Sequence, residues 1–353
     1  MYICLMTAIE KVVIKKAIVH RIGNPTREEA LKLSSNALTL NDPIVEKLLL
    51  KYFLGSVNEN ELYQFTHLHN IELNEVYNYV SAIFNDPDDF ILQSNKIAEF
   101  LYSKSTHVKV KEGELCVVLM ENVPFEKEFV PALGIFKSET KETFLKVLQH
   151  GQSLELISED GIAVNKPDKA CLVFKTASAD GYKVCIIDYI NKQQETHYWV
   201  KDFLQVQPLA NSYHNTDKYL ALCKQFVTNE YAGKFEVSKT DQMEMLNRSM
   251  DYFKTKDQFS LQEFTGEVIH HPEVVDSFML YKKNFETARN YEIEDEFDIN
   301  LTAVKKQQKL FKSILKLDKN FHIYIHGRRD LIERGTDEKT GKKFYKIFFE
   351  EES

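Results

Sequence analysis

Residues 170–187 read ACLVFKTASADGYKVCII, which is two runs of strand-forming residues joined by a turn signal. β-Branched and aromatic side chains favour strands, and Asp180-Gly181 is a dipeptide typical of the tight turn of a β-hairpin. The stretch therefore predicts two neighbouring antiparallel strands.

Further strand-type runs lie on the N-terminal side of this hairpin. They cover residues 115–120, 129–136, 144–148 and 154–157, and Asp160-Gly161 adds another turn signal after the last of them. Short apolar runs separated by turns predict an antiparallel meander. Residues 12–22, VVIKKAIVHRI, predict one more strand, which ends at Gly23.

Helical patterns flank the meander on both sides. Asp42 followed by Pro43 is a typical helix start, with a capping side chain and proline at the first helical position. Amphipathic spacing predicts helices over 44–54, 73–84, 88–103, 216–228, 239–253, 261–269 and 272–289. Beyond them the pattern predicts a hairpin of 313–317 with 321–326, and a last strand over 343–349.

The fold class that follows is α+β, and the length of 353 residues suits about two domains. Residues 207–212, QPLANS, have the composition of a linker. We therefore expect an N-terminal mixed domain of helices and meander over 1–206, and a C-terminal helical domain ending in a small β-sheet over 213–353.

The cysteines and the hydropathy pattern indicate a cytoplasmic protein. Five cysteines are scattered without a C-x-x-C pair, which is typical of reduced thiols. No run approaches the roughly 18 apolar residues of a membrane span, and no signal-peptide core is present. We expect no membrane association.

The common catalytic motifs do not occur in the sequence. The P-loop, the nucleophile elbow, the H-E-x-x-H zinc motif and the dinucleotide-binding G-x-G-x-x-G are missing. Three histidine pairs occur, His67 with His69, His270 with His271, and His322 with His326, and each lacks a third ligand. Glu159-Asp160 is placed in a turn, so paired-carboxylate catalysis is unsupported. We expect no enzymatic activity, no metal and no cofactor.

The distribution of charge is the most informative feature for function. The chain has 45 basic and 53 acidic residues, a net charge of -8, but residues 301–346 hold 13 Lys and Arg against 5 Asp and Glu. That segment has a net charge of 13 - 5 = +8, so the rest of the chain carries -16. We call residues 301–346 the basic island. A local positive surface of this kind is typical of phosphate contact.

The predicted DNA-binding residues all lie in the basic island. They are Lys305, Lys306, Lys309, Lys312, Lys316, Arg328, Arg329, Lys342 and Lys343. If 301–311 is helical, Lys305, Lys309 and Lys312 fall on one face. The alternative is a solvated helix face, or a surface that docks on the acidic body of this chain or of a second subunit.

Two other charged segments have simpler interpretations. Lys11, Lys15, Lys16, His20 and Arg21 lie on the first predicted strand, where lysines prevent edge-to-edge pairing. Residues 291–298, YEIEDEFD, are interpreted as a solvated connector.

Several segments together resemble the bacterial nucleoid-associated protein family, the NdpA-like group. They are VVIKKAIVHRI (12–22), EGELCVVLMENV (112–123), CIIDYINKQQETHYWVKDFLQV (185–206), FSLQEFTGEV (259–268), FDINLTAVKKQQKLF (297–311) and FHIYIHGRRD (321–330). The resemblance extends over about residues 10–350. It implies a non-enzymatic, cytoplasmic protein of the bacterial nucleoid that associates with DNA.

Three hypotheses for function stay open at this point. The first is a protein that contacts double-stranded DNA through the basic island with weak sequence preference. The second is an acidic interaction module that a DNA-processing protein recruits to the nucleoid. The third, which the sequence favours least, is a metal-dependent nucleic-acid enzyme. A homodimer is the default for a soluble chain of this size.

Overall fold

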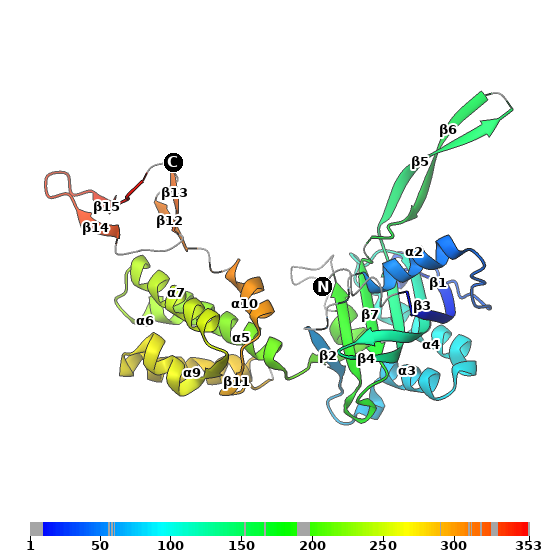
Figure 1. The fold of residues 1–353 in the computed structure, drawn as a ribbon, viewed down its shortest axis with the longest axis horizontal. Helices are drawn as coiled ribbons and strands as arrows, with labels where there is room; N and C mark the ends of the chain where they lie inside the picture. The colour runs from blue at the N-terminus through cyan, green and yellow to red at the C-terminus, as the bar shows by residue number, and fades with distance from the viewer. Residues whose placement is uncertain are drawn as a thin grey trace. The chain divides into compact units, whose positions relative to one another are not determined.

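The protein is of α+β class, as predicted. The computed structural model describes residues 10–55, 57, 59, 61–151, 153–165, 167–188, 198–289, 291–309, 311, 313–317, 320–325 and 331–351. For residues 188, 313–316, 322, 324 and 325 it describes the backbone alone. Two compact units divide the chain, Met1–Leu209 and Ala210–Ser353 (Figure 1). The domains predicted from sequence, 1–206 and 213–353, stay a prediction about independent folding.

The first unit is built on an antiparallel sheet with helices on both faces. Its elements are β1 (Val13–Ile22), α2 (Pro43–Leu54), β2 (Leu62–Phe65), α3 (Glu75–Asn85), α4 (Phe90–Lys104), β3 (Gly113–Phe125), β4 (Glu128–Ser138), β5 (Lys141–His150), β6 (Ser153–Ile162), β7 (Lys169–Phe174), β8 (Lys183–Asp188), a π-helix (Tyr198–Leu204) and β9 (Val206–Pro208). The strand order in the sheet is β1-β3-β4-β7-β8-β2-β9.

Both faces of this sheet are buried, which explains the continuous apolar runs of its strands. Side chains alternate between faces along a strand. Leu115 and Val117 of β3 therefore join the core beneath α3, α4 and the π-helix. Trp199 of the π-helix belongs to the same core. Cys116 and Val118 join the second core, under α2. The sheet is the middle layer of three (Figure 1).

Several local predictions from the sequence, among them a helix cap and a hairpin turn, are confirmed by the structure. The side chain of Asp42 accepts a hydrogen bond from the Ile44 amide at 2.8 Å and begins α2. β7 and β8 pair as the predicted hairpin, in which Gly181 has a φ of +94°. Cys116, Cys171, Cys185 and Cys223 are buried and are not part of a disulfide in the described structure.

Strand β1 lies at an edge of the sheet, as its lysines predicted. Lys16 pairs with Asp88 at 3.0 Å, and Arg21 pairs with Glu112 at 2.7 Å. The backbone of Arg21 also exchanges two hydrogen bonds with Lys32, so the following segment covers part of this edge.

Two sequence-based predictions for the first unit are wrong. Asp160-Gly161 is not a turn, because both residues lie inside β6, where they pair with Thr143 and Glu142 of β5. Residues 207–212 are not wholly a linker, because Gln207 and Pro208 belong to β9, which pairs with β2. In both places long-range pairing overrides the local turn or linker signal.

The second unit is a helical body with small two-stranded sheets. Its elements are α5 (Ser212–Gln225), a π-helix (Phe226–Tyr231), α6 (Ala232–Lys234), α7 (Lys239–Thr255), β10 (Gln258–Ser260), α8 (Leu261–Phe264), a π-helix (Thr265–Ile269), α9 (Pro272–Thr287), β11 (Glu296–Asp298), α10 (Leu301–Gln308), β12 (Ser313–Leu317), β13 (Phe321–Ile325), β14 (Ile332–Thr336) and β15 (Lys343–Ile347). Aromatic side chains fill its core, including Tyr219, Phe226, Phe253, Phe259 and Phe264.

The second unit also departs from the sequence-based predictions in two places. Residues 291–298 are not a solvated connector throughout, because Ile293 and Phe297 are buried and β11 pairs with β10. The sheet at the C-terminal end is two separate hairpins, β12 with β13 and β14 with β15. Strand β14 was not predicted, since Arg334 and Gly335 interrupt its apolar pattern.

Candidate nucleic-acid interface

Helix α10 carries the first lysines of the basic island. The side chain of Asn300 caps its N-terminus by accepting hydrogen bonds from the amides of Thr302 and Ala303, at 3.0 and 3.2 Å. Ala303, Val304 and Gln307 form the buried face, which packs on α5 and α7. This packing leaves the opposite face of α10 to solvent.

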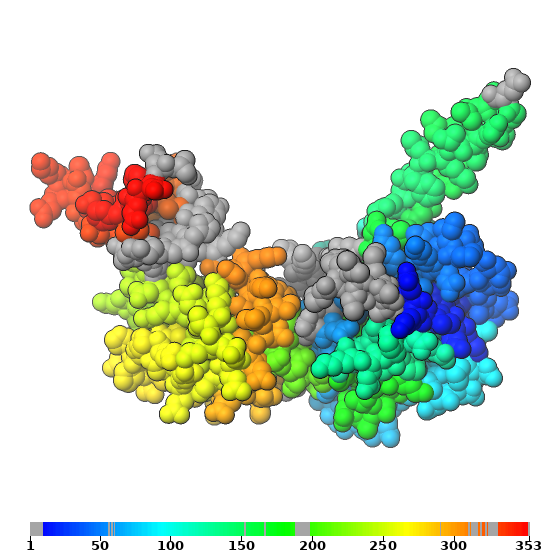
Figure 2. Space-filling view, viewed as in Figure 1, coloured from blue at the N-terminus to red at the C-terminus, as the bar shows by residue number. Residues whose placement is uncertain are grey.

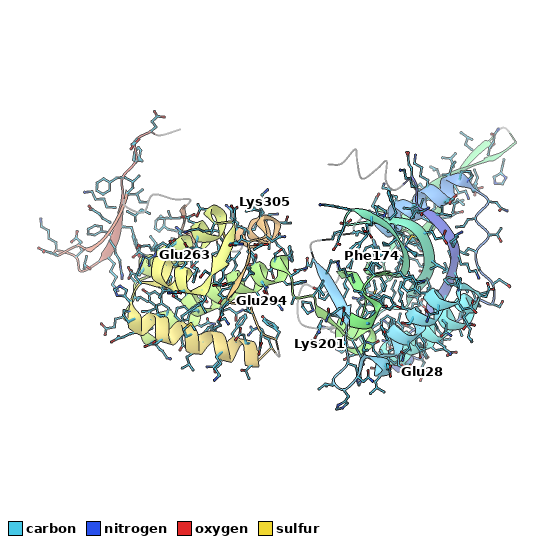
Figure 3. All side chains as sticks on the ribbon, turned by 60° about the horizontal axis from the view of Figure 1, so that its bottom comes forward. Glu28, Phe174, Lys201, Glu263, Glu294 and Lys305 are labelled. Atoms are coloured by element: carbon cyan, nitrogen blue, oxygen red, sulfur yellow. The ribbon has the colours of Figure 1, made fainter. Side chains whose placement is uncertain are left out.

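Lys305 and Lys309 are exposed, whereas Lys306 has a partner within the protein. Lys305 lies on the solvent side of α10 (Figure 3). Lys306 donates a hydrogen bond of 3.0 Å to the hydroxyl of Tyr213, and its ammonium lies 5.4 Å from the centre of that ring. Lys306 is thus a contact between α10 and α5 in addition to being a charge of the island.

The structure describes only part of the predicted face of Lys305, Lys309 and Lys312. Helix α10 ends at Gln308, so Lys309 is the residue that caps its C-terminus. Lys312 lies outside the described residues. Lysines at this end of a helix also stabilise it, because they face the negative end of the helix dipole.

The remaining predicted residues that the structure describes lie at the two hairpins. Lys342 and Lys343 are exposed at the start of β15, and Lys343 is paired in register with Thr336. Lys316 lies on β12, where only its backbone is described, and Arg328 and Arg329 lie outside the described residues. Both α10 and the β14–β15 hairpin attach to α7, the hairpin through Ile332 and Tyr345 on Met243.

The turn between β14 and β15 is well determined by local hydrogen bonds. The Asp337 carboxylate accepts from the amides of Lys339 and Thr340, at 2.9 and 2.8 Å, and Gly341 follows with a φ of +69°. These donors lower the pKa of Asp337 below its usual value. The turn therefore keeps a negative charge beside Lys342.

Positive charge is concentrated in the first part of the basic island. Residues 301–330 have eight Lys and Arg and two Asp and Glu, a net of 8 - 2 = +6, and residues 331–346 have five and three, a net of +2. The segment that contains α10, β12 and β13 therefore holds most of the charge that could contact phosphates.

The sequence analysis did not predict the exposed aromatic residues that lie near basic residues of the island. Phe344, Phe348 and Phe349 are exposed, and the ammonium of Lys346 lies 4.6 Å from the centre of the Phe348 ring. The sequence did contain a signal for this exposure. Residues 344–349, FYKIFF, have apolar side chains on both faces of one short strand, and such a strand cannot bury all of them.

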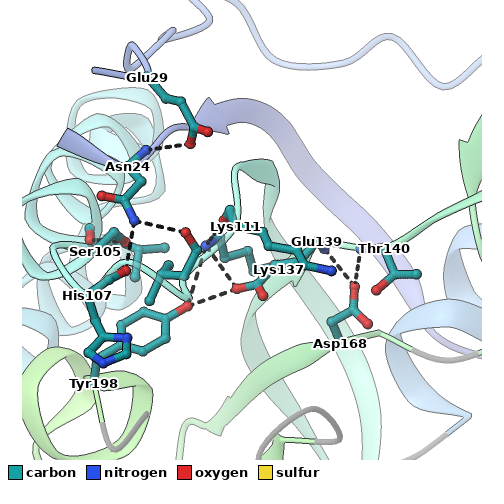
Figure 4. A network of polar contacts seen from close by, with 12 residues as sticks. Asn24, Glu29, Ser105, His107, Lys111, Lys137, Glu139, Thr140, Asp168 and Tyr198 are labelled. Carbon is teal, nitrogen blue, oxygen red and sulfur yellow. Dashed lines mark hydrogen bonds and ion pairs between the residues drawn. The ribbon is translucent and has the colours of Figure 1, made fainter. Parts of the chain in front are cut away.

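A buried polar network in the first unit is a further cluster of titratable groups (Figure 4). The ammonium of Lys137 is fully buried and donates to the Lys111 carbonyl at 2.9 Å and to the Glu139 carboxylate at 3.0 Å. Tyr198 donates to the same carboxylate at 2.9 Å. Burial lowers the pKa of Lys137, and the Glu139 charge opposes that shift.

This network holds the chain where β5 and β6 leave the sheet. The Asp168 carboxylate accepts hydrogen bonds from the amides of Glu139 and Thr140, at 2.6 and 2.7 Å. Each of these groups is satisfied by another of the network, which is the usual condition for buried polar groups. The arrangement supports a structural role rather than a reactive one.

The described part of the chain contains neither a metal-binding cluster nor a membrane span. Within the described residues, no three His, Cys, Asp or Glu side chains gather as a metal site would require. Over the same residues, no helix has both the length and the hydropathy to cross a membrane.

The described residues form an α+β protein of two units, and the sequence of the second unit holds a local excess of basic residues in an acidic chain. A family model described as "Nucleoid-associated protein YejK" matches residues 18–342. The chain therefore belongs to this family of nucleoid-associated proteins, and the resemblance found in the sequence is confirmed. The search of curated proteins finds no match.

Proposed function

We propose that the protein associates with DNA through residues 301–330 and contacts phosphates without reading bases. The observation that carries the proposal is the net charge of 8 - 2 = +6 in this segment, against -16 outside the basic island. Family membership supports the nucleoid as the place where the protein acts. In this role the protein is non-enzymatic and cytoplasmic, since the nucleoid lies in the cytoplasm.

Weak sequence preference is expected from the kinds of residues involved. Lysines, such as Lys305 and Lys309, act as point charges on phosphates, whereas base recognition requires donors held in a groove. Helix α10 has eight residues and is about 12 Å long, and its buried face is occupied by α5 and α7. Such a helix presents its end and one side, which suits backbone contact.

The second candidate is recruitment by a DNA-processing protein. The charge of -16 outside the basic island favours it, because an acidic body is repelled by DNA and attracts a basic protein surface. The two candidates differ in what they require of the island: direct contact needs its lysines, and recruitment does not.

The test is fluorescence-anisotropy binding to a labelled duplex over a salt series. Contact with about five phosphates gives a slope of log K against log salt near -4.5. Reversing Lys305, Lys309 and Lys316 to Glu should weaken binding and flatten this slope. Lys306 is left unchanged because its bond to Tyr213 has a structural role.

The matched control reverses three exposed lysines elsewhere, Lys127, Lys201 and Lys283. Both triple variants change the net charge by -6, so only the position of the change differs between them. Equal weakening by both would show that binding follows total charge and would overturn the assignment to residues 301–330. Absence of binding at low salt would favour recruitment by a protein partner.

A further inference from the structure

The β14–β15 hairpin projects from the helical body of the second unit (Figures 1 and 2). The five residues of each strand pair with those of the other strand. Side chains alternate between the two faces of such a hairpin, and residues opposite each other share a face. Phe344, Lys346 and Phe348 therefore lie on one face, which we call the aromatic face. Tyr345 and Ile347 lie on the other.

The aromatic face is directed away from the protein. Tyr345 and Ile332 on the opposite face pack on Met243 of α7. The aromatic face therefore stays in contact with solvent, and Phe344 and Phe348 are 44 and 39% exposed. Packing on one face of the hairpin thus presents two aromatic rings on the other.

The ring of Phe344 is held flat against the hairpin by a glycine. Gly335 is opposite Phe344 in the register. A Cβ at Gly335 would lie 2.4, 2.9 and 3.0 Å from Cζ, Cε1 and Cε2 of this ring. A point beyond the edge of the ring would be farther from Cε1 and Cε2, so the glycine lies under the flat side of the ring. One side of the ring thus covers the backbone of β14, and the other side faces solvent.

Positive charge beside the aromatic face comes from both hairpins of the basic island. Lys346 lies on the face itself, in an exposed pair with Glu333 at 4.0 Å. Ile323 of β13 packs on the same α7 residue as the β14–β15 hairpin, so the hairpin adjoins the segment 301–330. The net charge is 8 - 2 = +6 for this segment and 5 - 3 = +2 for residues 331–346.

An open ring among basic residues matches the chemistry of single-stranded nucleic acid. Proteins that bind single strands combine a basic surface with aromatic side chains on which bases stack. In a duplex the bases are stacked on one another and are out of reach of a ring on a surface hairpin. An apolar protein partner would not explain the lysines, because charged residues are depleted in the core of protein interfaces.

We propose that Phe344 stacks on an unpaired base of single-stranded DNA, while Lys346 contacts an adjoining phosphate. The proposal rests on the proposed function, because residues 301–330 supply most of the attraction for the strand. Phe344 is the stacking ring rather than Phe348, since acidic residues 350–352 follow Phe348. Stacking accepts every base, so sequence preference stays weak.

The test compares two labelled strands of equal length and charge, an oligothymidine of about 12 nucleotides and the same backbone without bases. Fluorescence anisotropy measures the binding of the full chain to each. The wild type should bind the oligothymidine at least about fivefold more tightly than the abasic strand. Phe344→Ala should weaken binding to the oligothymidine at least about fivefold and leave binding to the abasic strand unchanged. Phe344→Tyr keeps the ring and should behave as the wild type.

The matched control is Phe129→Ala in the first unit. Phe129 is 49% exposed, and the ammonium of Lys11 lies 5.3 Å from the centre of its ring. It thus resembles the aromatic face in exposure and in its neighbouring lysine, but it lies outside the basic island. Phe129→Ala should bind both strands as the wild type does, and circular dichroism should show unchanged folding of every variant.

The outcomes separate this proposal from the proposed function. Equal affinity of the wild type for the two strands would overturn the proposal, and this comparison does not depend on the folding of any variant. Oligothymidine binding that is unchanged in Phe344→Ala, or equally weakened in Phe129→Ala, would also overturn it. Duplex binding that is weakened by reversing Lys305, Lys309 and Lys316 would leave the proposed function standing in each case. Tighter binding of oligouridine than of oligothymidine would overturn the assignment to DNA.

Discussion

His20 makes the first unit sensitive to acid, and the size of the effect follows from its burial. The side chain is 1% exposed, and its Nδ1 accepts a hydrogen bond from the Ser34 amide at 3.2 Å. Among the described residues, Nε2 has no hydrogen-bond partner. Burial lowers the pKa of His20 from 6.5 to about 4, because a charged imidazole would lose its hydration.

The sign of the effect is a loss of stability as pH falls. Above pH 6.5 His20 is neutral in both folded and unfolded chains, so it makes no difference to folding. Between pH 6.5 and about 4 the unfolded chain binds a proton that the folded chain does not. With about 1.4 kcal/mol per pKa unit, the free energy of unfolding falls by about 3 kcal/mol from this group by pH 4.

The assay is urea unfolding at a series of pH values from 7 to 4, followed by fluorescence. The chain has one tryptophan, Trp199, which is buried in the first unit and therefore reports on the unit that contains His20. We expect the wild type to lose about 3 kcal/mol more than His20→Gln over this range. The difference between the two proteins cancels the titration of the carboxylates that they share.

The control for this experiment is His69→Gln, which changes an exposed histidine of the same unit. Its pH dependence should follow that of the wild type. If His20→Gln also follows the wild type to within about 0.5 kcal/mol at every pH, the reasoning from burial is refuted.

Three further predictions concern stability and domain organisation. Gly181→Ala should lower the free energy of unfolding by about 1–3 kcal/mol in the Trp199 assay, because φ is +94° and a Cβ would lie 2.3 Å from the Phe65 carbonyl oxygen; an unchanged free energy of unfolding would contradict it. Ser238→Ala should cost about 1 kcal/mol in thermal unfolding, because it removes the capping box with Asp241 at the start of α7; an unchanged melting temperature would contradict it. Limited proteolysis should cleave near residues 206–213 and release fragments that each unfold cooperatively, whereas fragments without cooperative unfolding would contradict the predicted domains.

The sequence predicted the helices and long strands of the first unit better than its connections. Runs such as Leu115–Met120 are apolar at every position because α2 covers one face of the sheet and α3 and α4 cover the other. The turn at Asp160-Gly161 was wrong because the dipeptide is compatible with a strand once Lys141–His150 supplies a partner. The turn propensity of two residues contributes less to the structure than the pairing of ten residues of β5 with ten of β6.

Short strands could not be predicted because their identity is decided by their partners. β2 has four residues and β9 has three, and they form strands only because they pair with each other and β2 pairs with β8. The buried Lys137 is a similar case, since its partner carbonyl on Lys111 lies 26 positions away. Lysine is ordinarily a surface residue, so the sequence alone favours an exposed Lys137 rather than a buried one.

The candidate interface was visible in the sequence as charge, but its geometry was not. A count of charged residues identifies the basic island without any structure. The bond from Lys306 to Tyr213 joins residues 93 positions apart, and the end of α10 at Gln308 depends on the chain that follows. Composition therefore identifies the candidate interface, and only the fold shows which of its described lysines face solvent.

The net charge of the whole chain is a poor guide to whether residues 301–330 contact DNA. At physiological ionic strength the field of an exposed charge falls off over about 8 Å. A compact unit the size of the second one has a radius of gyration of about 15 Å, so most charges of the molecule lie beyond that distance from any one surface. A phosphate next to Lys305 and Lys309 therefore experiences the local excess of basic residues more strongly than the -8 of the chain. Acidic composition limits long-range attraction to DNA, and hence the rate of encounter, more than it limits the contact once formed.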